Sequence, residues 1–212
     1  MKLYTFPQAP SPRRVHLFLA EKGLQLEERH IDLMKGEHFK PPLSELNPEC
    51  TVPVLELTDG TSLAQVMAIC RYLEELHPDP PLFGDSPQAR AMITERNRWV
   101  EMNGFLSVAD AFRNTTSGMR DHAVTGTRPV AQIPELAERG HERYQWFLED
   151  LDAWLAEHDH VGGRDFSVAD ITAWVAIEFA RWAIKEDMPK TLTRLADWHR
   201  RVGSRPAITG AS

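Results

Sequence analysis

Asn47-Pro48-Glu49-Cys50-Thr51-Val52-Pro53-Val54-Leu55 carries the clearest fold signal in the chain, together with Asp59-Gly60 and the segment Leu63-Ala64-Gln65-Val66-Met67-Ala68-Ile69 that follows. A proline opens a short apolar strand, the Asp-Gly pair reverses the chain, and a helix is expected to begin near Gln65. This order places an exposed strand edge beside a helix N-terminus. A strand edge can pair with an extended peptide, and the free N–H groups of a helix start attract a carboxylate. The stretch therefore predicts a site for a small, anionic, peptide-like ligand.

Size and composition narrow the class of protein. With 212 residues the chain is long enough for one large domain or two small ones. The formal net charge of −7 argues against nonspecific binding to nucleic acid. Cys50 and Cys70 form neither a disulfide framework nor a CxxC metal knuckle, which fits a reducing compartment. Since no run approaches 18 apolar residues and Met1–Phe6 resembles a strand more than a signal peptide, we expect a soluble, cytoplasmic protein with no membrane partner.

The first part of the chain alternates strands and helices. Leu3–Phe6 and Leu26–Ile31 are predicted strands, and Ser11-Pro12 is predicted to cap a helix that ends at Gly23. A short or irregular helix is expected within 34–46, where Pro41-Pro42 interrupts the pattern. A hairpin around Asp59-Gly60 and a helix over Gln65–Leu76 complete the order β-α-β-α-β-β-α, with Val66, Ile69, Leu73 and Leu76 on the apolar side of that helix.

A proline-rich segment separates this α/β part from an all-helical part. His77-Pro78-Asp79-Pro80-Pro81 cannot form regular structure. Beyond it, apolar residues recur at helical spacing from Trp99 to Phe112 and from Tyr144 to Leu155. Ser167 and Asp170 predict a capping box for a further helix whose buried stripe is Val168, Ile171, Trp174, Val175 and Trp182. A last helix is expected from about Lys190 to Val202. The predicted divisions are a domain at 1–78, a linker at 79–87 and a helical domain at 88–212.

These features resemble the cytosolic glutathione transferases over essentially the full length. The specific signals are residues 47–69 and the capped helix start at 163–174, whereas the other helices are generic. The resemblance implies a thioredoxin-like N-terminal domain, an all-helical C-terminal domain, a homodimer, and glutathione as co-substrate. It also implies detoxification chemistry, in which the glutathione thiolate attacks a small electrophile.

By this resemblance, the ligand cradle includes Val52, Pro53, Gln65 and Val66. A cis peptide bond before Pro53 would turn the Val52 backbone toward the cysteinyl backbone of glutathione, although proline also opens ordinary strands. Gln65 would hold the γ-glutamyl amine. At Val66 the family usually has serine, so the hydroxyl donor to the γ-glutamyl carboxylate is missing and weaker binding is expected. Val66 could alternatively be a packing residue in a degenerate site.

Other cradle residues are implied less specifically. His38 or Lys40 would reach the glycyl carboxylate, although both could simply lie on a solvated helix face. Thr51 occupies a position where the family commonly has glutamine. Cys50 lies next to the cradle and could form a mixed disulfide with a thiol, or could be a plain small residue.

The group that stabilises the thiolate should lie between the first strand and the first helix. Aligning Arg14-Val15 with the family's Arg-Val places the usual serine or cysteine at Ala9, which has no donor. Ser11 is therefore the catalytic candidate, with a role as helix cap as the alternative. Tyr4 is a weaker candidate because it lies within the predicted strand.

The second substrate would contact the first long helix of the C-terminal domain. Phe105, Ala109, Phe112 and Arg113 are the candidates, although aromatic residues at helical spacing commonly form core. No metal is expected, because His158 and His160 lack further ligands at suitable spacing. Two rival functions remain: a glutathione-dependent disulfide reductase, and a non-catalytic glutathione-binding protein, which the missing hydroxyls at Ala9 and Val66 would favour.

Overall fold

A computed structural model describes residues 1–210 of the chain. These residues form two compact units: unit 1 comprises residues 1–80 together with 124–129, and unit 2 comprises 81–123 and 130–210. The domain divisions expected from the sequence stay predictions, and residues 211–212 lie outside the described part.

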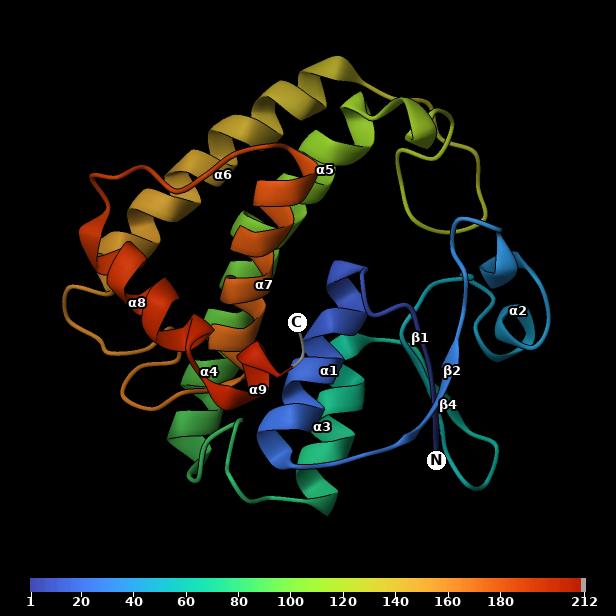
Figure 1. The fold of residues 1–212 in the computed structure, drawn as a ribbon, viewed down its shortest axis with the longest axis horizontal. Coiled ribbons are helices and arrows are strands. Elements are labelled where there is room, and N and C mark those ends of the chain that lie inside the picture. Colours follow the sequence, from blue (N-terminus) through green and yellow to red (C-terminus); the bar gives the residue numbers. More distant parts are fainter. Residues whose placement is uncertain (211–212) are drawn as a thin grey trace. The chain divides into compact units, whose positions relative to one another are not determined.

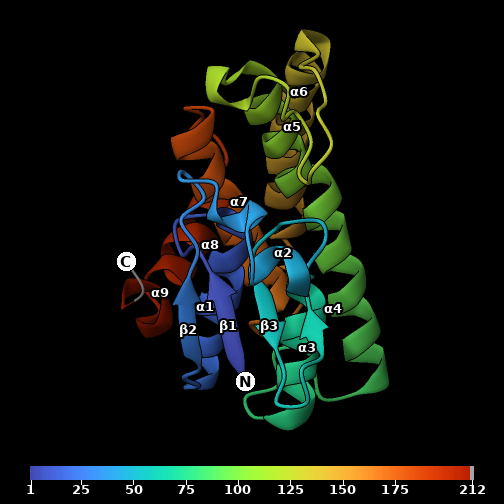
Figure 2. The same ribbon diagram turned by 90° about the vertical axis from the view of Figure 1, so that its right-hand side faces the viewer.

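Unit 1 is built on a four-stranded sheet with the order β2-β1-β3-β4. β1 runs parallel to the edge strand β2 and antiparallel to β3, with Leu3 opposite Glu28 on one side and Leu55 on the other. Tyr4 and Val54 pack with Ile31 and Leu43. α1 and α3 lie together against one face of the sheet (Figure 2). The elements of unit 1 are β1 (Lys2–Thr5), α1 (Pro10–Lys22), β2 (Glu27–His30), η1 (Glu37–Phe39), α2 (Leu43–Leu46), β3 (Val54–Glu56), β4 (Ser62–Leu63) and α3 (Val66–Leu76).

The start of α1 differs from the prediction. The helix begins at Pro10 with Ala9 as its N-cap, so Ser11 is not the cap. The reason is that proline is well suited to the first helical position, since its fixed φ is helical and its missing N–H would be unpaired there. The predicted end is confirmed: Gly23 has a φ of +64°, and its N–H bonds to the carbonyl of Ala20 at 3.1 Å.

A buried lysine joins the ends of α1 and α3. The Lys22 side chain is 0% exposed and pairs with Glu74, its Nζ lying 2.6 Å from a carboxylate oxygen. Nζ also donates to the carbonyls of His77 at 2.7 Å and Pro80 at 2.5 Å. One fully desolvated ammonium therefore holds the chain segment that follows α3. Leu76, which was expected on the buried side of α3, is 49% exposed because it lies in the last turn.

Unit 2 consists of helices (Figure 1). The single long helix expected across Trp99–Phe112 is divided by a π-helical turn at Gly104, where an added Cβ would lie 2.7 Å from Cζ of Phe147. α5 and α6 pack side by side. The elements are α4 (Pro87–Val100), η2 (Glu101–Phe105), α5 (Leu106–Thr115), η3 (Ser117–Met119), α6 (Pro134–Trp154), α7 (Val168–Ala183), α8 (Thr193–Gly203) and α9 (Pro206–Thr209).

α7 is the central helix of unit 2, and its predicted capping box is confirmed. The buried Asp170 carboxylate accepts from the N–H of Ser167 at 3.0 Å, from the N–H of Val161 at 3.0 Å and from Nε1 of Trp198 at 2.9 Å. Trp182, expected in the buried stripe, is 45% exposed because it lies in the last turn of α7.

The end of the chain also differs from the prediction. α8 starts at Thr193 rather than Lys190, and after it Pro206 opens a further short helix, α9. Within residues 1–210, no helix combines the length and the apolar character needed to cross a bilayer.

Candidate functional site

The strand edge in front of β3 has the predicted form. The Val52–Pro53 peptide bond is cis, Pro53 is buried and Val52 is half-buried. Within residues 1–210, the N–H and C=O of Val52 form no hydrogen bond. Both main-chain groups are therefore available to an extended ligand.

The register of the hairpin brings this edge to the start of α3. Leu55 pairs with Leu63 and Glu56 with Ser62 in antiparallel fashion. The last pair, Leu55 with Leu63, lies two residues from Pro53 on one strand and two residues from Gln65 on the other. Two sequence-predicted pairs, Val52–Pro53 and Gln65–Val66, thus lie beside each other across the hairpin.

The start of α3 offers unpaired donors. Gln65 is its exposed N-cap, and the first helical bond runs from the Ile69 N–H to the Gln65 carbonyl at 2.9 Å. The N–H groups of Val66, Met67 and Ala68 find no acceptor among the described residues. Together with the helix dipole they favour an anion. The Val66 side chain itself is 6% exposed and adds no donor.

Asn47 supports the loop that leads to the cradle, a role the sequence analysis did not assign. Its buried side-chain amide donates to the carbonyl of Thr51 at 3.1 Å and to Oγ1 of Thr51 at 2.9 Å. Its Oδ1 accepts from the N–H of Glu49 at 3.2 Å. Cys50, between them, is buried with a φ of +52°. The only sequence signal for this role was an Asn-Pro pair four residues before Thr51.

His38 and Lys40 lie in and directly after η1. The His38 ring packs on Phe39 with 3.9 Å between ring centroids, and Lys40 is exposed. Their roles stay predictions.

Ser11 is the second residue of α1 and is half-buried. Its Oγ accepts from Nη2 of Arg14 at 3.4 Å. Because Pro10 and Pro12 have no N–H, Ser11 has the only main-chain donor in the segment 10–12, and this N–H is not engaged within residues 1–210. One residue thus presents both an N–H and an O–H at the positive end of a helix.

Tyr4, the weaker candidate, is engaged elsewhere. Its hydroxyl donates to Oε2 of Glu56 at 2.8 Å, and the ring is 4% exposed. Burial raises the pKa of the Tyr4 phenol, and the bond to Glu56 raises it further. Tyr4 is therefore poorly placed to donate to a thiolate.

The four candidates for contacts to a second substrate are half-buried residues of unit 2. Phe105 and Phe112 both contact Phe179 of α7, with centroids 5.6 and 5.9 Å apart. Ala109 lies between them on α5. Arg113 donates to the carbonyl of His122 at 3.0 Å, and burial lowers the pKa of its guanidinium.

Trp182 joins this aromatic cluster and was not expected there. Its ring lies 5.6 Å from Phe112 and 5.4 Å from Phe179. The spacing of apolar residues within α7 predicts that Trp182 is buried in that helix's stripe. Its contact with Phe112 involves another helix, α5, and cannot be inferred from that spacing. Across residues 1–210, no three His, Cys, Asp or Glu side chains are grouped so as to hold a metal.

Comparison with known proteins identifies the family. Residues 9–76 match the glutathione S-transferase N-terminal domain and residues 133–210 match the glutathione S-transferase C-terminal domain. Glutathione S-transferase 2 of Saccharomyces cerevisiae is 33% identical over 98% of this chain and 88% of its own length.

Solved structures agree with this result. The crystal structure of Gtt2 from Saccharomyces cerevisiae has a TM-score of 0.91 at 32% identity, covering 100% of both chains. A glutathione S-transferase domain-containing protein of Marinobacter aquaeolei VT8 has a TM-score of 0.88 at 36% identity, covering 98% of this chain and 100% of its own. With both domain models matched in order and full-length relatives above 30% identity, the chain belongs to the glutathione S-transferase family, and the fold and transferase activity predicted from its sequence are confirmed.

Proposed function

We propose that this enzyme binds glutathione along the Val52 strand edge and directs its thiolate at a small electrophile. The observation that carries the proposal is the pair of unbonded main-chain groups on Val52, opposite the free N–H groups that begin α3. An extended peptide with a carboxylate at one end would satisfy both sets of groups at once.

The ends of the tripeptide are assigned by the family resemblance. Gln65 would hold the γ-glutamyl amine, and the N–H of Val66 would bind the neighbouring carboxylate. Thr51, fixed by Asn47, would flank the peptide. His38 or Lys40 would supply positive charge or a donor to the glycyl carboxylate.

Ser11 would stabilise the thiolate. A cysteine thiol has an ordinary pKa of about 8.5, so the enzyme must favour the charged form near neutral pH. Hydrogen bonds to the charged form and the positive end of a helix both lower a thiol pKa. Ser11 offers an N–H and an O–H at such an end.

The test is the pKa of the bound glutathione thiol, titrated by the ultraviolet absorbance of the thiolate. Ser11→Ala removes the O–H and keeps the N–H, so the thiol pKa should rise. Ser11→Thr should restore the wild-type value, and Ser44→Ala is the matched control on another helix. An unchanged thiol pKa in Ser11→Ala would remove the hydroxyl from the mechanism.

The electrophile would contact Phe105, Ala109, Phe112 and Arg113. The aromatic faces suit an apolar aromatic substrate. Phe112→Ala should therefore raise KM for a chloronitrobenzene and leave the KM for glutathione unchanged. Equal changes in the KM for the chloronitrobenzene and the KM for glutathione would count against a contact between Phe112 and the second substrate.

The non-catalytic alternative is favoured by Ala9 and Val66, which remove two hydroxyls from the expected site. Disulfide reduction is the other alternative, since bound glutathione could itself carry out thiol exchange without a protein cysteine. Parallel assays with a chloronitrobenzene and with a glutathione mixed disulfide separate the three functions. Binding of glutathione without turnover of either substrate would favour the non-catalytic function.

A cytoplasmic homodimer is part of the proposal. Met92, Met102 and Leu106 are apolar residues exposed along α4, η2 and α5, and such residues support a contact with a partner subunit. Sedimentation should show twice the chain mass of 24.1 kDa. Met102→Glu, which places a charge at this surface, should shift the protein toward the monomer.

A further inference from the structure

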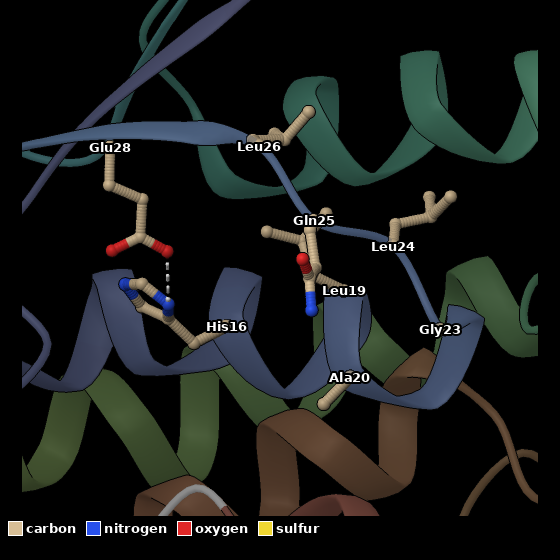
Figure 3. Close-up of a pocket in the computed structure, with 8 residues that line it drawn as sticks. All are labelled: His16, Leu19, Ala20, Gly23, Leu24, Gln25, Leu26 and Glu28. Carbon is tan, nitrogen blue, oxygen red and sulfur yellow. Dashed lines mark ion pairs between the residues drawn. The ribbon is translucent and has the colours of Figure 1, made fainter.

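A groove of about 500 Å³ lies in unit 1, away from the glutathione cradle. It runs between the second half of α1 and the segment that leads from Gly23 into β2 (Figure 3). None of the predicted glutathione-binding residues lines it. The lining residues are His16, Leu19, Ala20, Gly23, Leu24, Gln25, Leu26 and Glu28.

One end of the groove is polar. Nδ1 of His16 lies 3.4 Å from Oε1 of Glu28, and the two side chains face each other from α1 and β2 (Figure 3). Nε2 of His16 lies 2.7 Å from Oγ1 of Thr5. The other Glu28 oxygen lies 3.5 Å from Nε2 of His30. The His16 ring is therefore held between the Thr5 hydroxyl at Nε2 and the Glu28 carboxylate at Nδ1.

This arrangement does not make a catalytic triad, although hydroxyl, imidazole and carboxylate follow one another as they do in one. Thr5 is 0% exposed, so its hydroxyl cannot reach a substrate. The function left to Thr5 is to fix the His16 ring, which in turn orients the Glu28 carboxylate toward the groove.

The charge of the polar end is negative. Burial lowers the pKa of His16 from 6.5, so the imidazole is mainly neutral at pH 7. The Glu28 side chain is one-third exposed, and the lining includes no Lys or Arg. A ligand at this end must therefore bring a positive charge and hydrogen-bond donors.

The remainder of the groove is mixed. Leu19, Ala20 and Leu24 contribute apolar surface, and the Gln25 side chain extends toward α1 (Figure 3). Pockets that bind small ligands commonly have volumes of about 300–1,000 Å³, with apolar walls and a few oriented polar groups. The groove has a volume in this range, and its walls are polar as well as apolar.

We propose that this groove binds a small primary ammonium ion with a short aryl or alkyl body. The ammonium group donates to Glu28, and the body lies along Leu19 and Ala20. The amide of Gln25, which extends toward α1, borders the groove (Figure 3). The site is separate from the glutathione cradle, so both ligands bind to one subunit at the same time.

The neighbouring residue in β2 provides a matched control. Successive side chains of a strand point to opposite faces, and Glu27 pairs with Lys2 at 2.9 Å rather than with His16. Glu27→Gln and Glu28→Gln therefore make the same chemical change one residue apart, and only Glu28→Gln removes a groove charge.

The experiment is a titration of the full-length protein with 2-phenylethylammonium chloride at saturating glutathione, followed by backbone amide NMR shifts. Saturable shifts at Ala20, Gly23 and Gln25 are expected. Glu28→Gln should weaken binding about tenfold or more, the size expected for a lost hydrogen bond to a charged group. Glu27→Gln should bind like the wild type. Equal affinities in both variants, or no saturable shift at these amides, would overturn the proposal.

Two further ligands test which chemical group is recognised, and one further variant tests where it binds. Phenylacetate has a similar body and the opposite charge, and 2-phenylethanol has no charge, so each should bind at least about tenfold more weakly than the ammonium. Ala20→Phe should block the groove and abolish the shifts while leaving glutathione binding unchanged. Displacement of the ammonium by glutathione, or tighter binding of phenylacetate, would also overturn the proposal.

Discussion

In the proposed glutathione cradle, Val66 occupies the position where the family usually has serine. It begins α3, its side chain is buried, and the free N–H groups that follow it are still in place. The helix start can therefore attract a carboxylate without a hydroxyl. What is missing is one further donor to a charged group.

Val66→Ser should bind glutathione about tenfold more tightly or better, because a hydrogen bond to a charged group contributes about 1.5–3 kcal/mol. Isothermal titration measures the gain. Val66→Ala is the control, since it removes the same methyl groups and adds no hydroxyl. If the serine and alanine variants bind alike, the γ-glutamyl carboxylate does not lie at this helix start.

Several residues of the candidate site could be named from the sequence, and others could not. The edge at Val52 and the helix start at Gln65 depend on a turn only a few residues long, so a local pattern reveals them. The contact of Trp182 with Phe112 joins α7 to α5 across about 70 residues of chain, and no spacing within either helix encodes it. The sequence predicts Ser11 as the N-cap of α1, whereas the structure has Ala9 there. Pro10 and Pro12 both fit the first helical turn, so the sequence alone does not decide at which of them the helix begins.

Among the helices, the approach of α5 to α6 is decided by one glycine. A Cβ on Gly140 would lie 2.7 Å from the carbonyl oxygen of Ser107 and 2.8 Å from the N of Ala111. Both neighbours are main-chain atoms in a helix, so neither can move aside alone. This contact explains why a glycine occupies the seventh position of a 21-residue helix.

Gly140→Ala should destabilise the protein by about 1–3 kcal/mol, the usual effect of overpacking. In an exposed helix interior, a glycine-to-alanine change would raise the free energy of unfolding by up to about 1 kcal/mol. The sign of the measured change therefore distinguishes a close contact at Gly140 from an open position. Urea unfolding measures the difference. Gly118→Ala, which meets no atom within 4 Å, should leave stability nearly unchanged. A Gly140→Ala variant as stable as the wild type would show that α5 and α6 can separate freely.

Helix ends with local signals were predictable, and helix interruptions were not. Gly23 ended α1, and Ser167 with Asp170 started α7, as the sequence indicated. Gly104, within the π-helical turn, packs closely against Phe147 of α6, and no local pattern encodes this contact. Pro206 could equally close one helix or open another, and the structure shows a new helix.

For the molecule as a whole, two titrating groups make stability fall as the pH is lowered. Burial lowers the pKa of His16 from 6.5, so the unfolded chain binds its proton first, and stability is lost as the pH falls below about 6.5. The bond from His199 lowers the pKa of Glu178 from 4.5, so stability present above that pH is lost below it. The two losses therefore occupy different pH windows.

Urea midpoints are measured from pH 7.5 to about pH 3.5. Between pH 7.5 and pH 5 they should fall in the wild type and fall less in His16→Gln. Glu178→Gln should instead flatten the profile only below about pH 4.5. His122→Gln is the control for the first window, because His122 is exposed. A profile in His16→Gln as steep as that of the wild type would assign the loss to another group.

The burial of Lys22 has a consequence for chemical labelling. An acylating reagent needs an uncharged, accessible amine, and this ammonium is fully enclosed by Glu74 and two carbonyls. Lys35, Lys40 and Lys190 are exposed and should react quickly in the native protein. Mass spectrometry of acylated peptides would then show Lys22 unmodified until α1 and α3 separate. The rate at which Lys22 is acylated therefore measures how often unit 1 opens.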